Sequence, residues 1–126
     1  MVELIRYQKT LYSHGEKKEV FFLRMDPSAR LDFDKMCNLI AERTTLTAYE
    51  VEFVLSELHD VLIENIEIGR GIELGRLGSI EPSVKATAVD SLEELNLKTL
   101  KKATLVYKPS ISLKKALKNL KYKILK

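Results

Sequence analysis

The chain has 126 residues, of which 45% are hydrophobic and 31% are charged, a composition typical of one globular domain rather than of a disordered chain. No apolar run approaches the roughly 18 residues of a membrane-spanning helix, and the charged start "MVELIRYQKT" does not fit a signal peptide. The single cysteine, Cys37, excludes an internal disulfide and is compatible with a reducing compartment.

Charge is distributed unevenly along the chain. Residues 1–94 hold 11 basic and all 18 acidic residues, a net charge of −7, whereas residues 95–126 hold ten lysines and no acid. Such a separation within one small protein favours a basic surface for a polyanion, either DNA or RNA. The alternative is a lysine-rich end that is only solvated.

The first half of the chain predicts two strands and then two helices. Residues 1–25 are rich in β-branched and aromatic residues on both sides of "SHGEKK", which indicates a β-hairpin with Gly15 in its loop. A first helix is expected from Leu31 or Asp32, because apolar residues then recur at helical spacing, at Phe33, Met36, Cys37 and Ile40. A capping-box pattern, "TAYE", predicts a second helix from Ala48 to about Glu67.

The second predicted helix is apolar on more than one side. Tyr49 and Phe53 lie away from its main stripe, which consists of Val51, Val54, Leu55, Leu58, Leu62 and Ile66. A helix of this kind needs more than one packing partner. In a chain this small, a second subunit is the natural supplier of that partner.

Glycines and a second cap pattern divide the next segment. The stretch "GIELGRLGSIEPSV" predicts two short strands around a glycine-rich turn. The stretch "SLEELNLKTLKK" begins with Ser91 and has Glu94 three residues later, which favours a short helix over Ser91–Lys102. The composition of "ATLVYK" predicts a strand after it.

The closing segment "KPSISLKKALKNLKYKILK" predicts a last helix that starts near Ser112. Its apolar stripe would pack on the body of the protein and consist of Leu113, Leu117, Leu120 and Ile124. Lysines would flank this stripe on one side of the helix, and Lys126 would lie further from the stripe around the helix. The pattern fits a solvated face, a surface that contacts phosphates or a membrane-surface helix. The absence of Trp and the need of the stripe for a small core disfavour the membrane.

The order of these elements resembles the bacterial HU and integration-host-factor group of DNA-bending proteins over roughly residues 30–126. The resemblance rests on "LIAERTTLTAYEVEFVLSELHDVLIENI", "IELGRLGSIEPSV" and "VYKPSISLKKALKN". Positions within them that match the group's pattern are Leu46, Thr47, Gly75, Gly78 and the Lys108-Pro109-Ser110 junction. The HU-related histone-like branch, which has an added N-terminal segment and a lysine-rich last helix, is the most similar.

This resemblance implies an intertwined homodimer with a helical body and a saddle-shaped β-sheet for DNA. In the group, two β-arms reach into the minor groove, and a proline near each tip wedges between base steps. The matching stretch here, "KATAVDSLEELNLKTLKKAT", has no Pro, Arg or Gly, and it contains Asp90, Glu93 and Glu94. Because acids repel phosphates, proline intercalation is not expected, and the short helix would replace the flexible arm.

Lysines of residues 98–126 are expected to contact phosphates with little sequence preference. The candidate DNA-binding residues are Arg76, Lys85, Lys98, Lys101, Lys102, Lys108, Lys114, Lys115, Lys118 and Lys121. For some of them a structural role is the alternative: Lys98 would pair with Glu94 on a helix, and Arg76 would cap its turn.

No catalytic or metal-binding pattern is found. His14 and His59 are isolated in the sequence, and Cys37 falls on the apolar face of the first helix, where a small core residue is expected. Metal-ligand spacing, a nucleophile elbow and a phosphate-binding loop are missing from the sequence. We therefore expect no enzyme, no cofactor, no metal and no small-molecule substrate.

Together these patterns predict an α+β fold: a single HU-like domain over residues 1–126, acting as a homodimer. Residues 1–27 would be an N-terminal β extension, residues 28–126 the HU-like core, and residues 85–104, approximately, a modified arm. The expected function is non-specific binding of double-stranded DNA in the cytoplasmic nucleoid, with no role at membranes. The alternative is an HU fold reused as a protein-interaction or structural module.

Overall fold

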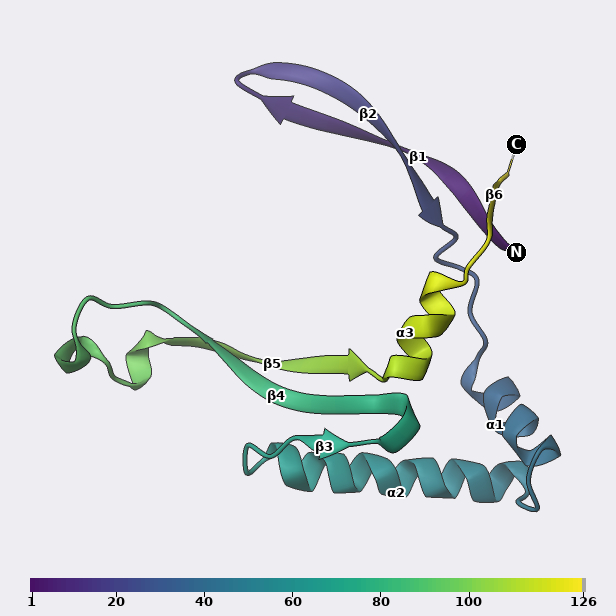
Figure 1. The fold of residues 1–126 in the computed structure, drawn as a ribbon. Helices are drawn as coiled ribbons and strands as arrows, with labels where there is room; N and C mark the ends of the chain where they lie inside the picture. Colours follow the sequence, from purple (N-terminus) through teal and green to yellow (C-terminus); the bar gives the residue numbers. More distant parts are fainter. Residues whose placement is uncertain (126) are drawn as a thin grey trace.

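The structure, a computed structural model, describes residues 1–125 and has an α+β fold. Within that range it contains three α-helices and two three-stranded sheets. Figure 1 shows a helical base and two long β-ribbons that project from the same side of the molecule. The strand near the C-terminus lies beside the strand at the N-terminus.

β1 (Val2–Ser13) and β2 (Glu16–Met25) form the N-terminal hairpin, which confirms the predicted pair of strands. His14 and Gly15 at its turn both have positive φ, 50° and 78°. Two-residue turns with positive φ match the natural twist of paired strands. The hairpin belongs to a sheet with the order β2-β1-β6.

α1 (Phe33–Glu42) and α2 (Ala48–Ile66) confirm the two predicted helices. The side chain of Asp32 caps α1 by accepting a hydrogen bond from the backbone N–H of Lys35 at 2.8 Å. Thr47 and Glu50 form the predicted capping box, with the two reciprocal bonds at 3.1 and 3.2 Å. Since these bonds satisfy N–H groups that have no partner within the helix, both helices begin where their local sequence dictates.

β3 (Ile72–Glu73), β4 (Gly78–Ala86) and β5 (Leu100–Pro109) form the second sheet, in that order and antiparallel throughout. A 3₁₀ turn, η1 (Gly75–Leu77), joins the first two strands. The predicted strands around the glycine-rich turn and at "ATLVYK" are confirmed. β4 and β5 extend beyond β3 as a long two-stranded arm.

The helix predicted over Ser91–Lys102 is wrong. This segment contains two 3₁₀ turns, η2 (Leu92–Glu94) and η3 (Leu97–Thr99), and β5 has begun by Leu100. Ser91 makes no capping hydrogen bond with its side chain. The Asn96 side chain accepts from the Lys98 N–H at 2.8 Å, and the Thr99 hydroxyl donates to the Asn96 carbonyl at 2.8 Å. These local bonds close a turn at the position where a helix would need helical backbone bonds.

The prediction of one long last helix is also wrong. α3 (Ile111–Lys118) ends after eight residues, and β6 (Tyr122–Ile124) pairs with β1 in parallel. The predicted stripe from Leu113 to Ile124 therefore does not exist as one helical face. Pairing with β1, at the other end of the chain, overrides the helical pattern: the Val2 N–H donates to the Lys121 carbonyl at 2.7 Å. Lys126, also assigned to that helix, lies outside the described residues.

The core of the described chain is very small. Cys37 and Val51, at 3% and 4% exposure, are its buried hydrophobic residues, so the predicted core position of Cys37 is confirmed. Leu117 is 60% exposed, contrary to the expectation that the tail leucines fill the core. The exposed surface is 11237 Å², whereas a compact monomer of 14.4 kDa exposes about 6,800 Å². The isolated chain is therefore far more open than a compact globular monomer.

Candidate nucleic-acid interface

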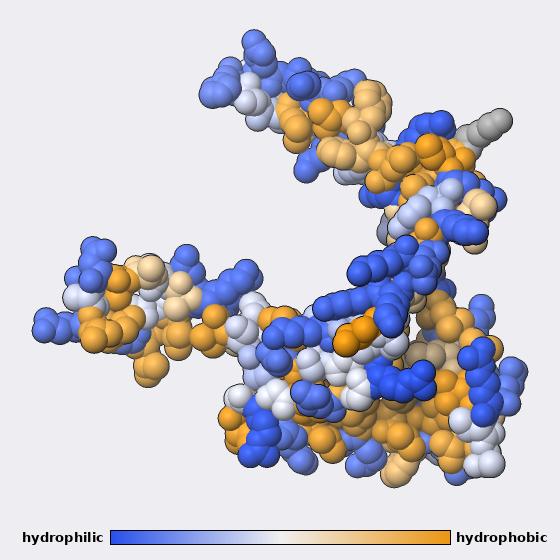
Figure 2. Space-filling model, viewed as in Figure 1, coloured by the Kyte–Doolittle hydropathy of each residue, from blue (hydrophilic) through white to orange (hydrophobic). Residues whose placement is uncertain are grey.

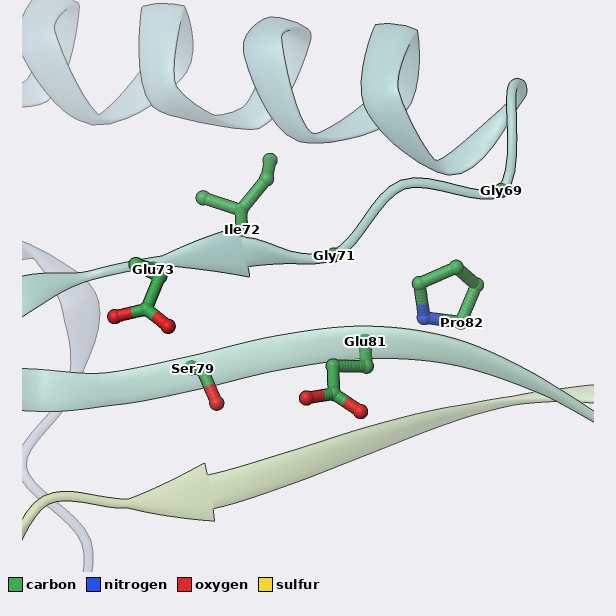
Figure 3. Close-up of a pocket in the computed structure, with 7 residues that line it drawn as sticks. All are labelled: Gly69, Gly71, Ile72, Glu73, Ser79, Glu81 and Pro82. Carbon is green, nitrogen blue, oxygen red and sulfur yellow. The ribbon is translucent and has the colours of Figure 1, made fainter.

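The β4–β5 pair has an apolar face and a polar face. Pro82 is opposite Leu105 on one face, and polar residues fill the alternate positions except Val106, which is opposite Glu81. Figure 3 shows Pro82 and Ile72 of β3 on the side of α2, while Ser79 and Glu81 point away from this helix. Because successive side chains of a strand alternate between faces, the polar face consists of Ser79, Glu81, Ser83, Lys85, Lys102, Thr104, Val106 and Lys108.

The lysines of the polar face differ in their surroundings. Lys85 and Lys102 are directly opposite each other across the two strands, and like charges in this position repel. A bound anion would relieve this repulsion. The Lys108 Nζ lies 3.3 Å from a carboxylate oxygen of Glu81, so its charge is partly neutralised. Lys85 is therefore the stronger candidate of the two.

The junction between β5 and α3 is fixed by close contacts with η1. Gly78 has φ 110°, and a Cβ at this position would overlap the carbonyl oxygen of Lys108, so only glycine fits. The Tyr107 hydroxyl donates to the Leu77 carbonyl at 2.5 Å. The Ser110 hydroxyl bonds the Arg76 carbonyl at 2.6 Å, and its oxygen caps α3 by accepting from the Leu113 N–H. These bonds place Arg76 next to the first turn of α3.

α3 carries three exposed lysines within eight residues: Lys114, Lys115 and Lys118. Lys114 and Lys118 are one helical turn apart on the same side. Lys115 and Lys118 lie in the last turn, where the helix dipole favours positive charge. Figure 2 shows a mainly hydrophilic surface over α3, between the two β-ribbons, although Ile111 in the first turn of this helix is 74% exposed. This helix therefore adds a dense positive surface to the molecule.

All ten predicted site residues are exposed, but they form three separate groups. Lys85, Lys102 and Lys108 lie on the polar sheet face, whereas Lys101 has no partner on β4, because the register shifts between Lys85 and Ala86. Lys98 lies in η3 at the arm tip. The third group lies around α3 and consists of Arg76, Lys114, Lys115, Lys118 and Lys121.

Sequence reasoning missed the basic residues that lie near the chain ends. Lys123 is in β6 and forms an ion pair with Glu3 at 3.2 Å. The alternation of "KYKI" at residues 121–124 is a strand signal that was available in the sequence. The hairpin adds further basic side chains at Arg6, Lys9, Lys17, Lys18 and Arg24.

No group of residues in the described chain has the arrangement of a catalytic centre. The hollow in Figure 3, about 300 Å³, is lined by Glu73, Glu81 and Ser79 among its polar residues, and no histidine or cysteine lines it to activate or replace the serine. His59 is exposed and only contacts the neighbouring Asp60, at 3.1 Å. Burial raises the pKa of the Cys37 thiol, and the carboxylates of Glu52 and Asp34 raise it further, which disfavours the nucleophilic thiolate form. A search of residues 1–125 finds no cluster of metal ligands, nor a helix long and apolar enough to cross a membrane.

Comparisons with known proteins support the fold and the family. Curated proteins give no match to the chain. Among solved structures, a protein from Bacteroides vulgatus ATCC 8482, described as a "Putative bacterial DNA binding protein", has a similar fold with a TM-score of 0.61 and 14% sequence identity. The similarity covers 98% of this chain but only 48% of that protein, so the chain spans about half of its length.

The family profile described as "HU domain fused to wHTH, Ig, or Glycine-rich motif" matches residues 4–123. This match includes the N-terminal hairpin, both long helices, the second sheet and α3. Because it covers nearly the whole chain, the protein belongs to the HU-HIG family of HU domains.

Proposed function

We propose that this HU domain binds double-stranded DNA with little sequence preference, through contacts between lysines and phosphates, and acts as a histone-like protein of the nucleoid. The observation that carries the proposal is the run of ten lysines without an acid in residues 95–126. Nine of them fall within the described residues, and all nine are exposed. The described neighbour, a "Putative bacterial DNA binding protein", supports DNA as the polyanion.

The proposed DNA-binding surface combines the polar sheet face with α3. Lys85 and Lys102 would contact phosphates at one end, and Lys114, Lys115 and Lys118 at the other. Lys101, Lys121 and Arg76 would contribute at the margins, and Lys98 would be the outermost contact. Lys108 would contribute least, because its ammonium group already lies 3.3 Å from Glu81. Contacts of this kind fix the position of DNA without selecting its sequence.

We further propose that the active form is a homodimer. The described chain exposes about 4,400 Å² more surface than a compact monomer of its mass would. Much of this excess is apolar and includes both long helices: Phe33 of α1 is 47% exposed, and Tyr49, Phe53 and Val54 of α2 are between 54% and 82% exposed. A second copy that packs on these helices would supply the missing core, as expected for an HU-like dimer.

Salt dependence tests the proposed mechanism. Counterion release makes the logarithm of the binding constant fall by about 0.9 per phosphate contact for each tenfold rise in salt. Titration of the protein with two unrelated duplexes of equal length should give similar affinities and the same steep slope. A binding constant that does not change with salt, or a strong preference for one duplex, contradicts the proposal.

A protein-interaction module is the second candidate function, because the hairpin exposes large apolar residues such as Phe21 at 72%. A gel-shift assay of the wild type and of a triple variant, Lys114→Glu, Lys115→Glu and Lys118→Glu, separates the two functions. DNA binding predicts a shift that the variant loses while its oligomeric state is kept. An interaction module predicts no shift for either protein at about 50 mM salt, where non-specific DNA binding is strong.

A further inference from the structure

The N-terminal sheet has an exposed apolar face that DNA binding does not explain. In the hairpin register, Arg6 is opposite Leu23, and Phe21 and Met25 occupy the alternate positions on the same face of β2. Tyr122 and Ile124 of β6 extend this face, since Ile124 is paired with Leu4 of β1. We call it the hairpin face and define it by Arg6, Phe21, Leu23, Met25, Tyr122 and Ile124.

The apolar side chains of the hairpin face are open to solvent. Phe21 is 72% exposed, and the other four are between 47% and 53% exposed. A hollow of about 430 Å³ is lined by Arg6, Phe21 and Leu23 of this face, together with the neighbouring Phe22 of β2. Contiguous apolar patches with polar rims mark sites of interaction with other proteins.

Charge around the hairpin indicates an acidic partner. On the hairpin face side, the register places two basic residues, Arg6 and Lys17, and one acid, Glu19, so this side carries a net charge of +1. Arg6 lines the hollow itself, and its guanidinium donates to the Leu125 carbonyl at 3.0 Å, which holds it in place. A fitting partner would therefore present apolar side chains beside carboxylates.

The arm tip of the same chain has this chemistry. Residues 89–97 carry three acids, Asp90, Glu93 and Glu94, and no basic residue. Leu92 and Leu97 at this tip are 86% and 84% exposed, more than any other leucine of the described chain. None of the three acids forms an ion pair within residues 1–125. The tip is therefore unsuited to phosphates and suited to a basic apolar surface.

We propose that the arm tip of one copy docks on the hairpin face of another copy. In Figure 1 the tip and the hairpin lie on two separate ribbons, both of which extend to the left, away from α3. A contact between two different surfaces of identical copies is heterologous, so it links copies into rings or open chains. Leu92 and Leu97 would enter the hollow beside Phe21, and Glu93 and Glu94 would face Arg6 and Lys17. The proposal does not depend on DNA binding.

Sedimentation velocity without DNA tests this contact. An interface smaller than about 800 Å² per partner is weak, so the titration should cover about 1 to 500 μM protein. The wild type should show a weight-average mass that grows at least about twofold over this range. The double variant Glu93→Lys with Glu94→Lys should keep, at every concentration of the titration, the weight-average mass that it has at the lowest concentration. The matched control is Glu64→Lys with Glu67→Lys, which changes the net charge by the same amount in α2 and just after its end. This control should associate like the wild type.

Charge exchange tests whether the hairpin is the partner of the tip. Arg6→Glu with Lys17→Glu alone should also abolish association, because both positions lie on the hairpin face side of the strand pair. A mixture of this hairpin variant with the tip variant should associate again, since the tip lysines then meet hairpin glutamates. Circular dichroism verifies that each variant is folded.

Three results would overturn the proposal: a constant wild-type mass, a tip variant that associates like the wild type, or folded variants that fail to associate when mixed. Binding of the tip variant to duplex DNA is measured in parallel. Undiminished DNA binding by a tip variant that no longer associates supports the proposed contact and leaves the proposed function intact.

Discussion

Neutralising the lysines of α3 should weaken DNA binding steeply. Each phosphate contact makes the binding constant at 0.1 M salt about 8-fold larger, relative to its value at about 1 M salt, where counterion release contributes little. Three of the proposed contacts come from Lys114, Lys115 and Lys118, which are exposed on a helix without acids. Replacing all three with glutamine therefore predicts about a 500-fold loss at 0.1 M salt, with a salt slope that is smaller by about 2.7.

Fluorescence anisotropy with a labelled duplex measures both quantities. Glutamine and lysine have similar helix propensities, and the capping bond from Ser110 to the Leu113 N–H is retained, so α3 should stay folded. The matched control is Lys35→Gln, Arg43→Gln and Arg70→Gln, which removes the same charge from exposed positions around α1 and α2.

The control should change affinity by less than about 10-fold and leave the salt slope unchanged, because these side chains lie outside the proposed surface. Equal losses in the α3 variant and the control would refute the assignment to α3. Such a result would mean that net charge alone, and not the position of the lysines, determines binding.

Three further predictions concern the framework that holds the site. Gly78→Ala should lower the free energy of unfolding by more than about 1 kcal/mol in urea, since φ is 110° and the new Cβ overlaps the Lys108 carbonyl; an unchanged midpoint would contradict this. Thr47→Ala should cost about 1 kcal/mol in the same assay, because it removes the capping box of α2, whereas a neutral effect would show that the cap is dispensable. Cys37 should react slowly with a thiol reagent until the protein is denatured, because the residue is buried and burial raises its pKa; equal rates in folded and denatured protein would be inconsistent with the fold.

Elements with local signals were predictable from the sequence. The capping residues Asp32 and Thr47 determine the starts of α1 and α2, and both bonds are present in the structure. The hairpin and the Gly78 turn also follow from local backbone preferences, because glycine is needed where φ is positive. In these cases the information lies within a few residues of the element.

Two predictions failed where a helical pattern competed with other hydrogen bonds, either to a distant strand or within a local turn. The tail reads as one helix until Tyr122–Ile124 pairs with β1, which lies at the opposite end of the chain. The pattern of Ser91 and Glu94 resembles a capping box, but the hydrogen bonds of Asn96 close a turn instead. The pairing of Lys108 with Glu81 likewise depends on the register of β4 and β5. The relative strengths of the candidate lysines therefore required the structure.

Lysine footprinting is the most direct test of where DNA binds. The intact protein is acetylated briefly with and without a duplex, and the modification of each lysine is measured by mass spectrometry. We expect protection of Lys85 and Lys102 on the sheet and of Lys114, Lys115 and Lys118 on α3, with Lys9, Lys17 and Lys35 unprotected. Protection confined to the hairpin lysines, or no protection at a DNA concentration that saturates binding, would contradict it.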